Sequence, residues 1–158
     1  MRALGIDPGT RRAGYAVVEE IGDKLRLLDA GILRANAAQN KDLLNQLSTE
    51  TKKICDTWQP EIIGIERLYF AKNQKTAIAV AQGRGAILAA AAACNAHIFE
   101  FSPNEIKLQI AGHGHADKKA ITKMVQLILG RADIKLIDDA MDAAAIALTA
   151  LRQKKLFS

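Results

Sequence analysis

The sequence predicts an α/β fold: a mixed five-stranded sheet, with three antiparallel strands followed by parallel strands reached through helical crossovers, flanked by helices. Three features indicate this fold. Short apolar strands open the chain, a helical apolar period then replaces the strand pattern, and isolated apolar strands separate the later helices. No linker, repeat or shift in composition divides the 158 residues, so we expect a single domain over residues 1–158.

Three strands are expected first, over residues 2–7, 14–20 and 25–34. Short connections join them. In the first connection, Asp7-Pro8-Gly9-Thr10, the positions of the proline and the glycine suit a type II turn. Strands joined this closely most simply form an antiparallel meander.

The apolar pattern then takes a helical period. Apolar side chains from Leu43 to Trp58 fall on one helical face, and Pro60 ends that helix. Residues 62–65 are a continuous apolar run, typical of a central strand. A second helix is expected over residues 76–95, and a fifth strand over residues 97–101.

Further helices are expected in the remainder of the chain. Ser102-Pro103-Asn104-Glu105 combines an N-cap, a proline at the first helical position and a capping-box glutamate, so a helix begins there. Asp117 can cap a helix over residues 118–129, and a last helix is expected over residues 139–153.

Composition and charge restrict the function only loosely. The chain has 22 Lys and Arg against 17 Asp and Glu, a net charge of +5, which favours a polyanionic partner. An aromatic content of 4% disfavours a sugar-binding platform or a sheet that stacks bases. An enzyme with separate cofactor and substrate domains would need a longer chain.

The chain is expected to be cytoplasmic. The apolar run that precedes Asp7 is too short for a signal peptide, and the longest apolar run, residues 86–94, is too short to span a bilayer. Cys55 and Cys94 lack the spacing of metal ligands. They are expected to be buried thiols in a reducing compartment.

Four acids indicate metal-dependent chemistry. Asp7 and Glu66 each follow a strand expected to be central, where the sites of such sheets gather. Asp139 and Asp142 are three residues apart in a helical segment, so their carboxylates share one face. Converging carboxylates repel one another and recruit cations, and hard oxygen ligands favour Mg²⁺ or Mn²⁺. Two such ions would stabilise the attacking water and the leaving oxygen of phosphodiester hydrolysis.

Each acid also has a structural interpretation. Asp7 could simply begin a turn, Glu66 could be a charge at a strand end, and Asp138 or Asp139 could cap the last helix. The pattern alone leaves these alternatives open.

Five blocks of sequence, in order from the first strand to the last helix, carry a resemblance. They are Gly5-Ile6-Asp7-Pro8-Gly9-Thr10, Ile65-Glu66, Ala71-Lys72-Asn73, Gln82-Gly83-Arg84-Gly85 and Asp139-Ala140-Met141-Asp142-Ala143. Together they resemble the RuvC family of bacterial Holliday junction resolvases. The resemblance implies an RNase H-like fold and a homodimer that nicks two opposing strands of a four-way DNA junction in recombination and repair. It also implies in-line attack by a metal-activated water, 5′-phosphate products, and partnership with the RuvA and RuvB branch-migration proteins.

The resemblance assigns roles to single acids. Asp7, Glu66, Asp139 and Asp142 match the family's catalytic, Mg²⁺-binding residues, with two ions per site and Mn²⁺ able to substitute. Asp138 lacks the three-residue spacing to Asp142, so we assign it to capping.

The resemblance also extends to residues that would meet DNA. Lys107 and Lys118 match lysines near the scissile phosphate, where an ammonium offsets developing negative charge, and Lys119 could share the role of Lys118. The family typically has Phe where this chain has Tyr69, in a loop that disturbs base stacking at the junction centre. Phe70 is the alternative wedge.

Three further features remain open between two interpretations. Basic residues around the same loops suit phosphate contact, but solvated surface positions explain them equally well: Arg11, Arg12, Lys72, Lys75 and Arg84. His113 and His115 could bind a metal, although a mobile loop is the better interpretation. The alanine-rich helix over residues 76–95 could form a symmetric dimer contact or pack on its own sheet.

Three rival functions compete with junction resolution. A YqgF-like nuclease acting on RNA would share the opening motif but not the stretch from Glu66 to Arg84. An actin-like kinase needs two lobes, for which 158 residues are too few. A non-catalytic junction-binding module would hold its acids for structural reasons. An Asp7→Asn substitution separates the last case, because a catalytic metal ligand should lose cutting and retain junction binding.

Overall fold

The computed structural model describes residues 1–9, 12–35, 40–67 and 74–155. Five strands and five helices make up this part of the chain, and their order follows the predicted one. The elements are β1 (Arg2–Asp7), β2 (Gly14–Ile21), β3 (Lys24–Ile32), α1 (Asn40–Trp58), β4 (Ile62–Glu66), α2 (Gln74–Ala92), β5 (His97–Phe101), α3 (Pro103–Ala111), α4 (Lys118–Ile128) and α5 (Asp138–Lys155).

The strands form one mixed sheet in the order β3-β2-β1-β4-β5. The first three strands pair antiparallel, as the short turns predicted, whereas β4 and β5 are parallel to β1. Because β1 and β4 are parallel neighbours with Ile6 opposite Ile65, their carboxyl ends lie side by side. Asp7 and Glu66, the next residue of each strand, therefore occupy one edge of the sheet.

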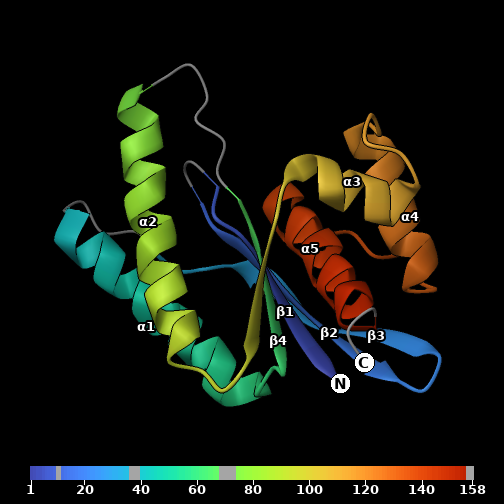
Figure 1. Cartoon of the computed structure of the whole chain (residues 1–158), viewed down its shortest axis with the longest axis horizontal. Helices are drawn as coiled ribbons and strands as arrows, with labels where there is room; N and C mark the ends of the chain where they lie inside the picture. The colour runs from blue at the N-terminus through green and yellow to red at the C-terminus, as the bar shows by residue number, and fades with distance from the viewer. Residues whose placement is uncertain (10–11, 36–39, 68–73, 156–158) are drawn as a thin grey trace.

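Helices cover both faces of the sheet, with α1 and α2 on one side and α3, α4 and α5 on the other (Figure 1). The alternation of side chains along β1 explains this arrangement. Leu4 and Ile6 are fully buried in the apolar layer that contains residues of α1 and α2, while Ala3 is buried in the layer that contains α5. The sheet is thus apolar on both faces, as expected for strands covered by crossover helices.

Helix α5 lies directly on the middle of the sheet because glycines leave room for it. A Cβ atom added to Gly5 would overlap the backbone carbonyl oxygen of Ala143, and one added to Gly14 would overlap that of Asp139. A Cβ atom added to Gly64 would also press against α5. This close approach of helix and sheet brings the acidic start of α5 to the edge that carries Asp7.

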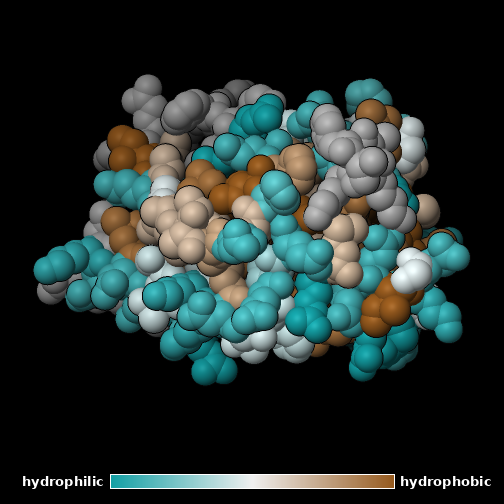
Figure 2. Space-filling model, turned by 60° about the horizontal axis from the view of Figure 1, so that its bottom comes forward, coloured by the Kyte–Doolittle hydropathy of each residue, from teal (hydrophilic) through white to brown (hydrophobic). Residues whose placement is uncertain are grey.

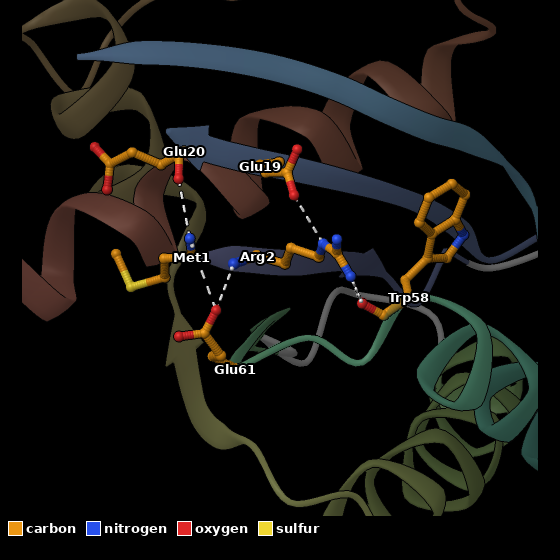
Figure 3. A network of polar contacts seen from close by, with 6 residues as sticks. All are labelled: Met1, Arg2, Glu19, Glu20, Trp58 and Glu61. Carbon is orange, nitrogen blue, oxygen red and sulfur yellow. Dashed lines mark hydrogen bonds and ion pairs between the residues drawn. The ribbon is translucent and has the colours of Figure 1, made fainter. Parts of the chain in front are cut away.

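A polar network fixes the opposite end of β1 (Figure 3). The guanidinium of Arg2 donates from Nε to Glu19 of β2 at 2.9 Å and from Nη1 to the carbonyl oxygen of Trp58 at 3.1 Å. The backbone nitrogen of Arg2 donates to Oε1 of Glu61 at 3.0 Å. These contacts tie β1 to β2, to the end of α1 and to the segment that enters β4.

The predicted caps of α3 and α4 are confirmed. The backbone nitrogen of Glu105 donates to Oγ of Ser102 at 3.2 Å, and that of Ser102 donates to Oε2 of Glu105 at 2.6 Å, which completes the capping box of α3. At α4, the Asp117 carboxylate accepts a hydrogen bond from the backbone nitrogen of Ala120 at 2.7 Å. Both caps stand before helices that carry lysines predicted to act at the site.

The prediction of a type II turn after β1 is wrong. Such a turn needs a left-handed backbone at its third residue, and Gly9 does not adopt one. Instead, the backbone nitrogen of Gly9 donates to the carbonyl oxygen of Asp7 at 2.9 Å. A Cβ atom on Gly9 would lie 2.5 Å from the carbonyl oxygen of Arg12, so this position favours glycine for its small size. Thr10 lies outside the described residues.

Hydrophilic side chains make up most of the face drawn in Figure 2, with apolar side chains in scattered groups between them. Among the described helices, none is both long and apolar enough to cross a membrane. Both cysteines are free thiols; Cys55 is buried, as predicted, and Cys94 is half-buried. Burial, followed by a hydrogen bond with Cys94, raises the pKa of Cys55 far above its usual value.

Candidate active site

Asp7 and Glu66 reach the site from adjacent parallel strands. Each is the last residue of its strand, β1 or β4, so the two side chains leave the sheet at its carboxyl edge. Each is half-buried, whereas the residues before them, Ile6 and Ile65, are fully buried. The apolar strands therefore hold two acidic groups at the boundary between core and solvent.

Asp139 and Asp142 reach the same place from the first turns of α5. Their spacing puts them on one helical face, and the contact between Gly14 and Asp139 sets how closely that face approaches the sheet. The buried alanines Ala140, Ala143 and Ala144 hold this part of the helix in the core. Two acids at the start of a helix also suit the positive end of its dipole.

The charges of the other three predicted acids act on Asp7. Its pKa is raised to about 7, chiefly by burial. Repulsion from the carboxylates of Glu66, Asp142 and Asp139 adds to this effect, and the charge of Lys118 opposes it. Since all three other acids act on Asp7, the structure gathers the four residues that the sequence singled out.

The neighbouring acids show the same effect. Burial, followed by repulsion from Asp142, raises the pKa of Glu66. Burial also raises the pKa of Asp142, and the ammonium of Lys118 limits the rise. The site is thus rich in negative charge that the protein only partly neutralises.

Lys118 lies between two acids of α5. Its Nζ atom is 3.3 Å from Oδ2 of Asp142 and 3.2 Å from Oδ2 of Asp138. Partial burial disfavours the ammonium, but the hydrogen bonds and charges of these two aspartates outweigh that cost and raise the pKa of Lys118. Asp138, assigned to capping from the sequence, is the first residue of α5 and holds this lysine instead.

Lys107 lines the same hollow from α3. A cavity of about 300 Å³ lies between α3, α4 and α5, and its wall includes Lys107, Lys118, Glu66 and Asp142. Apolar side chains such as Ile121 complete the wall. The structure thus brings both predicted lysines to the acids.

The predicted basic contacts divide into three cases. Arg12 points at the acids, with Nε 3.5 Å from Oδ2 of Asp139. Lys119 is exposed on α4, beside Lys118. Arg84 is turned inward: its guanidinium donates to the backbone carbonyl oxygen of Glu66 and to the carboxylate of Glu100, which does not support its predicted role as a DNA contact.

Several predicted residues fall outside the described part of the chain: Tyr69, Phe70, Lys72, Arg11 and, for its side chain, Lys75. His113 and His115 are exposed in the turn between α3 and α4. Within the described residues, no third donor joins them in a metal-binding group.

The donor set at the site fits a hard divalent cation. Four carboxylates supply only oxygen ligands, the type that Mg²⁺ and Mn²⁺ prefer. Burial and, after it, repulsion from the neighbouring carboxylates raise the pKa of Asp7, and such a cation would relieve that repulsion. As arranged, no three acidic, histidine or cysteine side chains of the described residues are close enough to form a metal-binding group. Arg12 and Lys118 instead pair with acids of α5.

The sequence analysis missed the internal contacts of Arg84, although a signal was present. Val80, Arg84, Ile87 and Ala91 recur at helical spacing, and the three apolar members of this series are buried. A charged residue on the buried face of a helix indicates an internal partner. The pairing of Lys118 with Asp138 had no comparable signal, because it joins two helices far apart in sequence.

Comparison with known proteins identifies relatives over almost the whole chain. A family model described as "Crossover junction endodeoxyribonuclease RuvC" matches residues 3–150. A protein named crossover junction endodeoxyribonuclease RuvC from Chloroflexus aggregans is 44% identical over 149 residues, which cover 94% of this chain and 91% of the relative.

Solved structures agree with these matches. The structure of Thermus thermophilus RuvC superposes with a TM-score of 0.89 at 30% identity, covering 99% of this chain and 97% of that one. The T. thermophilus protein in complex with a Holliday junction substrate gives a TM-score of 0.90 at 29% identity, covering 99% and 96%. These likenesses confirm the RNase H-like α/β fold predicted from the sequence.

Proposed function

Because the chain belongs to the RuvC family of crossover junction endodeoxyribonucleases, and is thereby an endonuclease of Holliday junctions, we propose that its four gathered carboxylates carry the reaction. The observation that supports this most directly is the raised pKa of Asp7, to which Glu66, Asp139 and Asp142 all contribute. A purely structural role would not require the charges of three further acids, from β4 and α5, to act on Asp7 of β1.

We assign the four acids to metal binding. Asp7, Glu66, Asp139 and Asp142 would hold two Mg²⁺ ions, and Mn²⁺ would substitute. When bound, the ions would stabilise the attacking and leaving oxygens of phosphodiester hydrolysis. The protein's own contribution is to fix four oxygen donors on β1, β4 and α5, elements whose buried backbones hold them in place.

Lys107 and Lys118 would contact the scissile phosphate. Both line the cavity beside the acids, and an ammonium there offsets negative charge that develops on the phosphate oxygens. Lys118 is held by Asp138 and Asp142, so its amino group is already directed at the site before the substrate arrives. Lys119 is proposed as a neighbouring phosphate contact.

The junction-specific contacts are assigned by family membership. Tyr69 or Phe70 would separate bases at the junction centre, and Arg11 and Lys72 would contact phosphates. We expect the RuvA and RuvB proteins to be its partners. We also expect the protein to act in the cytoplasm and residues 1–158 to form a single domain.

A homodimer follows from the need for two cuts related by symmetry. The exposed face of α2 is a candidate contact, because it presents apolar and small residues at helical spacing: Ile78, Ala81, Gly85, Ala89 and Ala92. Ile78→Glu should dissociate the dimer in sedimentation velocity. Ile21→Glu, which changes an equally exposed isoleucine of β2, should leave the dimer intact.

Cleavage assays test the proposed function. Purified protein is mixed with a synthetic four-way junction, a linear duplex and an RNA–DNA hybrid, each with and without Mg²⁺. We expect paired nicks on opposing strands of the junction only, and only with a divalent ion. The Asp7→Asn variant should bind the junction and not cut it. Absence of symmetric nicking with any divalent ion would refute the proposal.

A further inference from the structure

Arg84 is an internal residue of α2 that reaches the end of β4. Its side chain is only 15% exposed. Nε donates a hydrogen bond to the backbone carbonyl oxygen of Glu66 at 3.1 Å, and Nη2 pairs with the carboxylate of Glu100 in β5. One guanidinium therefore connects α2 with the carboxyl ends of two parallel strands.

The ladder between β4 and β1 stops short of Glu66. The paired register of β1 and β4 ends at Ile65, one residue before Glu66. On the other side, the backbone nitrogen of Arg67 donates to the carbonyl oxygen of Phe101 at 2.7 Å, and Nη2 of Arg67 donates to that of Glu100 at 3.2 Å. Arg84 adds a polar link between this end of the sheet and α2, beside the apolar layer that Ile65 and Ile87 share.

We propose that Arg84 is a positioning residue for the active site, which holds the backbone of Glu66 so that its carboxylate meets those of Asp7 and Asp142. This inference rests on the proposed metal-binding role of Glu66. It replaces the interpretation of Arg84 as a phosphate contact, because Glu100 already neutralises the guanidinium and little of the side chain faces solvent.

The planar guanidinium suits this task. It offers donors in a fixed fork, so it can bond a carbonyl oxygen and a carboxylate at the same time, which a lysine ammonium on its flexible stem does less well. Replacing a residue that orients a metal ligand without binding the metal itself typically lowers metal affinity or activity by about 10- to 100-fold. We expect an effect of this size for Arg84.

The test compares Arg84→Gln and Glu100→Gln with Arg26→Gln, which alters an exposed arginine on the opposite edge strand, β3. Mn²⁺ affinity is measured by titration calorimetry without DNA, and junction affinity by fluorescence anisotropy in metal-free buffer. Arg84→Gln should weaken Mn²⁺ binding by about tenfold or more and change junction affinity by less than about threefold. Glu100→Gln should shift Mn²⁺ affinity in the same direction by a smaller factor.

The opposite pattern would overturn the proposal. If Arg84 contacted phosphate, Arg84→Gln would weaken junction binding, while Glu100→Gln would release the guanidinium and strengthen it. Unchanged Mn²⁺ affinity in both variants would also refute the positioning role. If Arg84→Gln unfolds the chain, Glu100→Gln decides, since it removes only the anchor of the guanidinium. A wild-type protein that fails to cut junctions would refute the proposed function, yet the Mn²⁺ titrations would still decide the role of Arg84.

Discussion

Gly14 of β2 and Asp139 of α5 are in backbone contact, so that a Cβ atom on the glycine would overlap the carbonyl group of the aspartate. This contact joins the sheet to the helix at the residue proposed to bind metal. The position of Asp139 therefore depends on the absence of a side chain at Gly14.

Gly14→Ala should displace the start of α5 and destabilise the protein. Overpacking of a rigid contact costs about 1–3 kcal/mol or more, and urea unfolding measures the loss. Cleavage should also fall, because Asp139 moves. The control is Gly114→Ala in the turn between α3 and α4, where the nearest neighbouring atom lies 3.9 Å from an added Cβ atom, and this variant should keep or raise stability. Equal stability of the two variants would contradict the prediction.

Because of Asp7, the free energy of unfolding of the metal-free protein should fall as the pH rises. The pKa of Asp7 is raised to about 7 in the folded protein from an ordinary 3.8, so the unfolded chain releases this proton first. The stability that the protonated group provides is complete below about pH 4 and is lost as the pH rises toward 7.

Asp7→Asn should accordingly be more stable than the wild type at about pH 8 in EDTA, by roughly 2–4 kcal/mol, and equally stable near pH 4. Urea unfolding at both values measures the difference. Asp23→Asn, in the turn between β2 and β3, serves as the control and should show no such divergence. A variant that is less stable than the wild type at high pH would show that Asp7 stabilises the fold.

Divalent cations should stabilise the wild type by relieving repulsion among the acids. A ligand that binds only the folded state at 100 times its Kd adds about 2.7 kcal/mol. Saturating Mg²⁺ should therefore raise Tm, and Mg²⁺ added to Asp7→Asn should raise it much less. A similar rise in both proteins would place the bound ion away from Asp7.

Substitutions of Lys118 and Asp138 should distinguish the effect of the ammonium charge from the effect of its position. Removing the ammonium in Lys118→Ala should lower single-turnover cleavage by about 100-fold or more, since groups that stabilise developing charge contribute on that scale. Asp138→Asn keeps the ammonium and its contact with Asp142 and should cost much less. Quench-flow measurements at saturating enzyme compare the two, and an equal loss would make Asp138 a member of the catalytic site.

Much of this molecule was predictable because the signals are local. Alternating and continuous apolar runs predicted all five strands, and Ser102 with Glu105 predicted a cap that the structure contains. The spacing of Asp139 and Asp142 predicted a shared helical face. The turn at Gly9 was mispredicted, because proline and glycine positions suit a turn type without revealing that the carbonyl oxygen of Arg12 crowds this glycine.

Residue types and their spacing along the chain predicted the order of the elements, the four candidate acids and the family. They did not predict how α5 sits on Gly5 and Gly14, that Lys118 pairs with Asp138, or that Arg84 faces inward to the end of β4. These are contacts between segments distant in sequence. Their geometry follows from the packing of helices on the sheet, and local spacing does not encode it.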